Sequence, residues 1–137
     1  MSKFTEELEY DCLRVSTMCT IDANGYEKSL SRPMTWQCDK ADWDTGATVT
    51  VISERLVAEL GLIPIGRTKI SGYNGRPKVT NEYRVDLVFP NDIRVPFVKV
   101  VEAPLVTMDL LVGMNVINQG HLDIDFCNGK REFSFEI

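Results

Sequence analysis

The sequence of 137 residues contains a single histidine and no two cysteines in a C-x-x-C spacing. Its four cysteines, Cys12, Cys19, Cys38 and Cys127, share the chain with only His121, so no familiar zinc spacing can be assembled. We therefore expect no metal site. The simplest interpretation is that the thiols are reduced and mostly packed, as is usual in the cytosol.

Long apolar runs and clusters of basic residues are also missing. No window approaches the roughly 18 continuous apolar residues of a membrane span, and the acidic segment Met1–Glu7 lacks the apolar run of a signal peptide. The net charge is −5, with Lys and Arg scattered along the chain, which argues against a nucleic-acid surface. We expect a soluble, cytoplasmic protein that binds neither a membrane nor nucleic acid.

Short strands separated by turn signals account for most of the sequence. The clearest strand covers residues 79–89, where apolar and charged residues alternate. The apolar face comprises Tyr83, Val85, Leu87 and Phe89, and the charged face Glu82, Arg84 and Asp86. Pro96 in the next strand implies an edge or a bulge. Asn-Gly pairs at 24–25, 74–75 and 128–129 tolerate the positive φ angles of hairpin turns.

Helix is predicted in only two short segments. Ser53 stands where an N-cap belongs, residues 54–60 place apolar side chains on one face, and Gly61 is a C-terminal stop. A second helix of one or two turns is expected near residues 114–118, after the apolar strand 110–112. Many short strands with little helix predict an all-β, barrel-like domain.

The most informative stretch runs from Trp43 to Ser53, where a carboxylate on a short loop precedes a strand of β-branched residues. Asp44 is followed by Thr45, whose hydroxyl can form hydrogen bonds, and by Gly46, which allows a sharp turn. Two such carboxylates at hydrogen-bonding distance cannot both ionise and therefore share one proton. One then acts as a base toward water while the other polarises a carbonyl.

Three stretches carry a family resemblance. Asp44-Thr45-Gly46-Ala47 resembles the active-site loop of the retropepsin-like aspartic proteases, and Ile70-Ser71-Gly72-Tyr73-Asn74-Gly75 resembles their flap hairpin. The segment 110–117 resembles the apolar strand and short helix that cross behind the active-site loop. The resemblance covers residues 35–137 and implies a closed β-barrel of the acid-protease type. Residues 1–34 lie outside the resemblance, and their strand and turn signals predict an N-terminal extension that forms an added hairpin.

The resemblance also implies an activity and a partner. The chain has one Asp-Thr-Gly, so a two-carboxylate mechanism requires a symmetric homodimer in which the two Asp44 side chains meet. Thr45 would stiffen the paired loops, Gly46 would present backbone to the peptide substrate, and Ala47 would leave room for it. The flap, with Tyr73 near its tip, would cover a peptide bound as an added strand. No metal or organic cofactor is needed.

Two positions depart from the pattern that this resemblance implies. Retroviral members usually carry an Asp in the position of Thr48 and an Arg in the position of Met114, and the ion pair between these two residues braces the dimer. Both residues are uncharged here, so neither leaves a buried charge unpaired. The loss raises the question of how tight the dimer is. It also keeps open a second function, that of a catalytically weak or silent peptide-binding or assembly module.

Each predicted site residue also has an ordinary interpretation. Asp44 can be a turn residue bonded to nearby amides, and residues 70–75 can be a plain surface hairpin. Phe133, Phe135 and Ile137 alternate on the last strand, where they suit an interfacial sheet between subunits or a simple core strand equally well.

Overall fold

The computed structural model describes residues 2–8, 13–21, 35–71 and 75–137. The elements of this part of the chain are, in order, β1 (Lys3–Glu7), β2 (Leu13–Ile21), β3 (Thr35–Trp43), β4 (Thr50–Ser53), α1 (Glu54–Leu60), β5 (Gly66–Ser71), β6 (Pro77–Phe89), η2 (Pro90–Asp92), β7 (Ile93–Ala103), β8 (Leu110–Val112), α2 (Met114–Ile117), β9 (His121–Asp125), η3 (Cys127–Gly129) and β10 (Glu132–Glu136). Here η denotes a 3₁₀ turn. The Asn-Gly turn at residues 24–25, expected within the N-terminal hairpin, lies outside the described residues.

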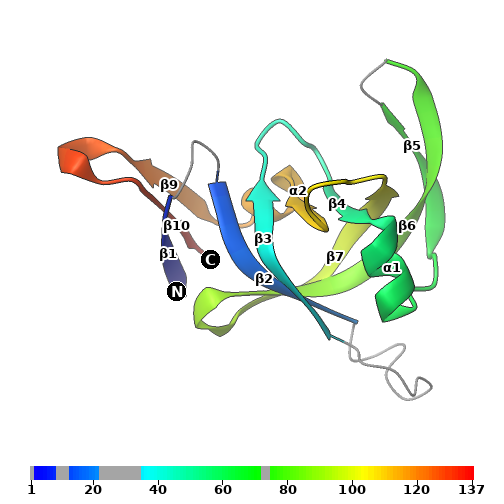
Figure 1. The fold of residues 1–137 in the computed structure, drawn as a ribbon, viewed down its shortest axis with the longest axis horizontal. Coiled ribbons are helices and arrows are strands. Elements are labelled where there is room, and N and C mark those ends of the chain that lie inside the picture. Colours follow the sequence, from blue (N-terminus) through cyan, green and yellow to red (C-terminus); the bar gives the residue numbers. More distant parts are fainter. Residues whose placement is uncertain (1, 9–12, 22–34, 72–74) are drawn as a thin grey trace.

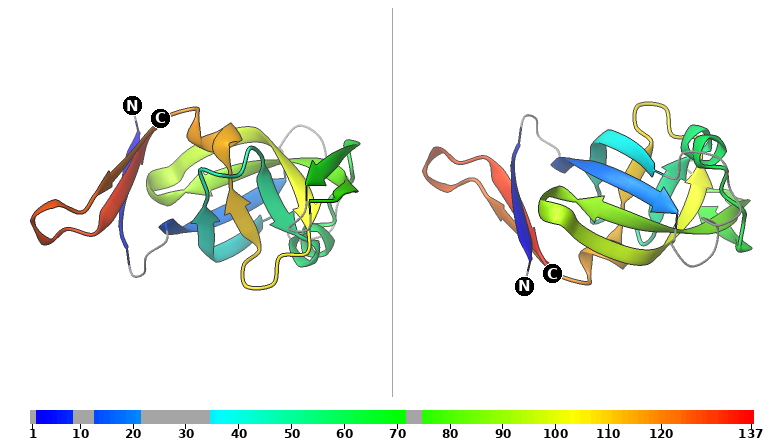
Figure 2. Two further views of the ribbon diagram at one scale, coloured as in Figure 1. Left: turned by 90° about the horizontal axis from the view of Figure 1, so that it is seen from above. Right: turned by 90° about the horizontal axis from the view of Figure 1, so that it is seen from below.

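The described strands form two sheets (Figure 1). The main sheet has the order β2-β3-β8-β4-β7-β6-β5, and β2 pairs in addition with β6, so the sheet is strongly curved. The second sheet, called here the terminal sheet, has the order β1-β10-β9. Figure 2 shows it at one end of the molecule, with the β5–β6 hairpin at the opposite end. No helix in the described part of the chain is long and apolar enough to span a membrane.

The sequence pattern of β6 is confirmed on its apolar face. Tyr83, Val85, Leu87 and Phe89 are each at most 2% exposed. The Tyr83 hydroxyl donates a hydrogen bond of 2.6 Å to Glu102 on β7. Burial and this hydrogen bond raise the pKa of Tyr83 to about 12, so the hydroxyl keeps its proton at neutral pH and ties the two strands together.

The charged face of β6 has one exception to the predicted pattern. Asp86 lies on this face but is buried. Its carboxylate accepts hydrogen bonds from Arg94 Nη1 at 2.6 Å and from the Phe97 N–H at 3.0 Å. The register between β6 and β7 shifts at this point, which marks the bulge that Pro96 predicted. The bulge turns a backbone N–H toward Asp86, and these partners compensate the cost of burying its charge.

The predicted helix ends are confirmed in α1. The Ser53 hydroxyl accepts a hydrogen bond of 3.0 Å from the Leu56 N–H, and Gly61 adopts the left-handed conformation with φ 64°. Leu56 and Leu60 are fully buried. α1 therefore covers the main sheet with the face that its apolar spacing indicated.

Five aromatic rings join the two sheets. Phe4 of β1 and two phenylalanines of β10 pack around Trp43, the last residue of β3, and Phe89 closes the cluster. The shortest separation between ring centroids is 5.0 Å, between Trp43 and Phe135. Because Phe133 and Phe135 are both fully buried within one chain, the last strand is a core strand.

We expect Phe4→Ala to lower the free energy of unfolding by about 3–5 kcal/mol, because the ring is fully buried between the sheets. Urea unfolding followed by tryptophan fluorescence would measure the change. Phe126→Ala is the matched control, since that ring is 58% exposed and its removal should cost less than about 1 kcal/mol. Equal losses in the two variants would contradict the packing of the terminal sheet on Trp43.

Candidate active site

The predicted catalytic residue lies directly after β3 on an exposed loop. The Asp44 N–H donates a hydrogen bond of 2.9 Å to the Val112 carbonyl, which attaches the start of the loop to β8. The Gly46 N–H donates to Asp44 Oδ1 at 2.8 Å, and the Ala47 N–H donates to the Asp44 carbonyl at 3.2 Å. The loop thus orients the carboxylate through its own backbone and leaves it accessible to solvent.

The end of β8 passes close behind this loop. A Cβ atom on Gly113 would lie 2.6 Å from the carbonyl carbon and oxygen of Val49, so only glycine fits without a backbone shift. The Met114 N–H donates to the Ala47 carbonyl at 2.7 Å, and the Gly113 N–H donates to Thr50 Oγ1 at 3.1 Å. Both ends of the loop are therefore held by one strand and the helix that follows it.

Asn115 is a structural residue of the site that the sequence analysis missed. Its Oδ1 accepts hydrogen bonds from the Thr50 N–H at 2.9 Å and from Thr50 Oγ1 at 2.7 Å, while its Nδ2 donates to the Lys99 carbonyl at 2.9 Å. Thr50 is fully buried, and a buried hydroxyl requires a partner. A threonine inside the apolar strand was the signal that a polar partner must lie opposite it.

Asp109 is a second carboxylate of this region, and its role is structural. Its Oδ1 accepts hydrogen bonds from Ser53 Oγ at 2.7 Å and from Arg55 Nε at 2.8 Å, and it also forms an ion pair with Arg55. Ser53 is at the same time the N-cap of α1. Asp109 therefore anchors the start of α1 to the bend that directly precedes β8.

The predicted flap is a two-stranded hairpin where the structure describes it. β5 pairs with β6 from Gly66 opposite Glu82 to Ser71 opposite Pro77. Gly75 has φ 70°, as expected for a tight turn, while Gly72, Tyr73 and Asn74 lie outside the described residues. Ile70 is half-buried, and Ser71 and Gly75 are exposed.

The positions of the remaining predicted residues are compatible with their expected roles. Those roles concern a second subunit or a substrate and stay predictions. Thr45 and Gly46 are exposed at the tip of the loop and Ala47 is half-buried. The stiffening of paired loops by Thr45 stays a prediction. Thr48 is exposed and Met114 half-buried. The backbone hydrogen bond from Met114 to Ala47 holds the loop to α2.

A curved β-sheet that presents an exposed Asp-Thr-Gly loop, held from behind by a glycine-containing strand and a short helix, is the arrangement of a retropepsin-like aspartyl protease. A family model described as "gag-polyprotein putative aspartyl protease" matches residues 40–119, which is more than half of the chain and includes both the loop and the strand behind it. The chain belongs to this family of retropepsin-like aspartyl proteases.

Solved structures that are similar to the chain include the following two. A retropepsin-like aspartic protease from Rickettsia conorii superposes with a TM-score of 0.63 at 12% identity, over 98% of this chain and 90% of that one. The retroviral protease-like domain of Ddi1 from Leishmania major gives a TM-score of 0.49 at 20% identity, over 86% of this chain and 84% of that one. No curated protein matches the sequence. The first similarity confirms the predicted retropepsin-like, mostly β fold with two short helices.

We expect Gly113→Ala to lower the free energy of unfolding by about 1–3 kcal/mol or more, because the added methyl group would overlap the Val49 backbone. Chemical denaturation would measure it. Gly66→Ala is the control, since its Cβ would lie 3.5 Å from a Glu82 side-chain oxygen, an ordinary contact, and should change stability by less than about 1 kcal/mol. A Gly113→Ala protein as stable as the control would disprove the close approach.

Proposed function

We propose that the protein is a homodimeric aspartic endopeptidase in which Asp44 of each subunit contributes one carboxylate to a shared site. The observation that carries the proposal is the exposed Asp44 carboxylate, oriented by the Gly46 amide on a loop held at both ends, in a chain of the retropepsin-like family. The exposure of the loop leaves space for a second copy to approach.

The chemistry follows from two carboxylates that share one proton. The ionised carboxylate accepts a proton from a water molecule, and the protonated carboxylate donates a hydrogen bond to the peptide carbonyl that the water attacks. The Gly46 N–H, bonded to Asp44 Oδ1 at 2.8 Å, limits rotation of the carboxylate, so the reacting oxygens are positioned before substrate binds. No step requires a metal or an organic cofactor.

The substrate in this proposal is a peptide bound in an extended conformation. Backbone hydrogen bonds to such a peptide are independent of its sequence, and side-chain pockets supply the selectivity. The β5–β6 hairpin, including the segment 70–75, is proposed to cover the peptide as a flap and to exclude water from the reaction.

The terminal sheet constrains how the subunits meet. β10 is its central strand and pairs with β1 and β9 of its own chain, so both of its edges are occupied. An interleaved sheet that used β10 of each subunit would have to displace one of these strands. We propose instead that the dimer forms through the active-site loops and a free edge of the terminal sheet, at β1 or at β9, where Ile124 is 44% exposed.

A cytoplasmic location belongs to the same proposal. Cys127 is an exposed free thiol, a state that suits a reducing compartment. An exposed thiol in an oxidising compartment would be prone to form mixed disulfides.

We expect Asp44→Asn to reduce cleavage of an unfolded protein by roughly 10²–10⁴-fold, because the ionisable pair is lost. The fold should be kept, since asparagine retains an oxygen that can accept the Gly46 N–H. Fragments sensitive to a statine-type inhibitor, detected by mass spectrometry, would report cleavage. Glu59→Gln, on the exposed surface of α1, removes the same charge and should leave activity unchanged. Full activity of Asp44→Asn would refute the proposed mechanism.

We expect sedimentation equilibrium to give a mass of twice the 15.5 kDa chain at protein concentrations where activity is measured. The reason is that one chain supplies one Asp-Thr-Gly and therefore half a site. A monomer at every concentration and pH would contradict the homodimer.

Two observations favour a second function, that of a peptide-binding or assembly module. Both edges of β10 are occupied and the Thr48–Met114 position carries no charge, which removes two ways of bracing a retroviral-type dimer. A protein that remains monomeric, binds unfolded peptides and yields no fragments would support the module and not the protease.

A further inference from the structure

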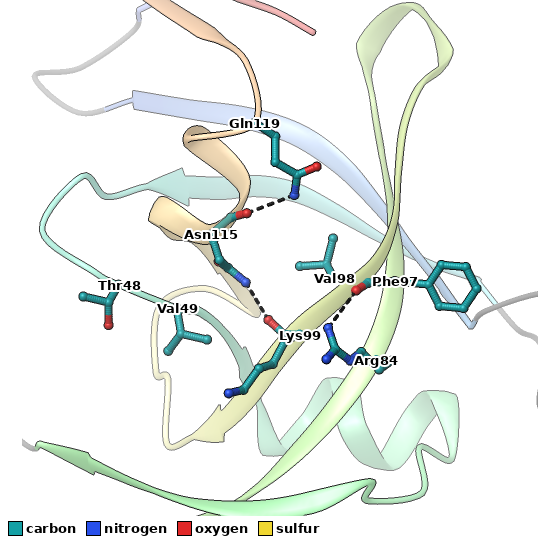
Figure 3. Close-up of a pocket in the computed structure, with 8 residues that line it drawn as sticks. All are labelled: Thr48, Val49, Arg84, Phe97, Val98, Lys99, Asn115 and Gln119. Carbon is teal, nitrogen blue, oxygen red and sulfur yellow. Dashed lines mark hydrogen bonds between the residues drawn. The ribbon is translucent and has the colours of Figure 1, made fainter.

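A cavity of about 380 Å³ lies beside the C-terminal end of the active-site loop. Thr48 and Val49 of the loop form one side of it, and Asn115 and Gln119 lie on another (Figure 3). The strands β6 and β7 complete the wall with Arg84 and the segment 97–99. The function proposed above does not use this cavity.

Two cations in the cavity wall are direct neighbours. Arg84 of β6 stands opposite Lys99 of β7 in the antiparallel register, so both side chains project from the same face of the sheet. Like charges in this position repel and lower stability. Their juxtaposition at a cavity, in a chain with a net charge of −5, indicates a site that gains from binding an anion.

Only one of the two cations has a carboxylate partner among the described residues. Lys99 Nζ lies 3.2 Å from Glu82 Oε1. Arg84 has no carboxylate within ion-pair distance in the described part of the chain, and its Nη1 donates a hydrogen bond of 3.0 Å to the Phe97 carbonyl. A guanidinium group has five N–H donors in a planar fork, so donors remain for a carboxylate.

The backbone that orients Arg84 is itself held in an unusual conformation. Phe97 has φ 56°, which costs free energy for a residue other than glycine, and its N–H is held by Asp86 Oδ1. Figure 3 shows the Phe97 ring directed away from the cavity while its carbonyl oxygen meets Arg84. The bulge thus positions a carbonyl group that fixes the guanidinium at the cavity wall.

One edge of the cavity lies close to Asp44 along the chain. Thr48 follows Asp44 by four residues, and four residues of chain span at most roughly 14 Å. An extended peptide advances roughly 3.3 Å per residue, so three or four residues of peptide span a similar distance. The subsite proposed below therefore places an acidic side chain at this spacing from the bond that is cleaved.

We propose that this cavity is a substrate subsite that binds the carboxylate of an Asp or Glu side chain three or four residues from the cleaved bond, through Arg84 and Lys99. The proposal rests on the proposed protease function. It assigns a preference for acidic substrates to an enzyme that is itself acidic. Glu82 already pairs with Lys99, so Arg84 supplies the net positive charge of the cavity wall, and negative charges more than about 8 Å away are largely screened at physiological salt.

The test compares two peptides that differ in one charge. Cleavage sites in a denatured protein are first mapped by mass spectrometry. Peptides around the strongest site are then made with either Glu or Gln at the third or fourth residue from the cleaved bond. We expect kcat/KM to be roughly tenfold higher for the Glu peptide, as a charge-assisted hydrogen bond allows. In Arg84→Gln the ratio of the two kcat/KM values should fall below about twofold.

Two control variants sharpen the comparison. Lys130→Gln removes one positive charge from the η3 turn, outside the cavity, and should keep the wild-type ratio. Arg84→Lys keeps the charge without the planar fork and should give an intermediate ratio. Equal rates of the wild-type protein on the two peptides, or a ratio unaffected by Arg84→Gln, would overturn the subsite and leave the protease function standing.

A different result would count against the protease function itself. If the wild-type protein cleaves nothing, a fluorescein-labelled ten-residue peptide with Glu at alternate positions, and its Gln counterpart, test the cavity by fluorescence anisotropy. Tighter binding of the Glu peptide that Arg84→Gln removes and Lys130→Gln keeps would support a carboxylate site without catalysis. Equal binding of the two peptides would overturn the cavity proposal as well.

Discussion

The whole site depends on how closely the backbone of β8 and α2 approaches the active-site loop. At Gly113 the separation is so small that a methyl group would lie 2.6 Å from the Val49 carbonyl. Only at this distance can hydrogen bonds run from Asp44 to Val112 and from Met114 to Ala47. The exposed carboxylate is thus held by main-chain bonds, whose geometry depends on few side-chain torsions.

Behind the loop, a buried polar pair replaces part of the apolar core. Thr50 is fully buried, and Asn115 satisfies both its N–H and its hydroxyl while binding the Lys99 carbonyl. A network of this kind stabilises only if every member has a partner, and it then specifies one arrangement of the elements it joins. Here it joins the start of β4, directly after the Asp-Thr-Gly loop, to β7 and so to the wall of the cavity.

The distribution of charge distinguishes groups that are engaged from groups that are available. Asp86 and Asp109 are engaged by Arg94 and Arg55, whereas Asp44 Oδ1 accepts only the Gly46 N–H of its own loop within the described part of the chain. Arg84 is bonded to a carbonyl and has no acidic partner in the described residues. This exposed carboxylate and this cation, both held by backbone groups, are the groups to which we propose that ligands bind.

Local features were determined by the sequence alone. The ends of α1 depend on residues three or four positions apart, and the alternation in β6 depends on neighbours, so both could be predicted. The Asp-Thr-Gly loop was recognisable for the same reason. Only the tertiary structure decided that Asp86 is buried, that Thr50 meets Asn115 across 65 residues, and that Arg84 stands beside Lys99. Strand register and a bulge create these contacts, and neither leaves a reliable local signal because both depend on which strands become neighbours.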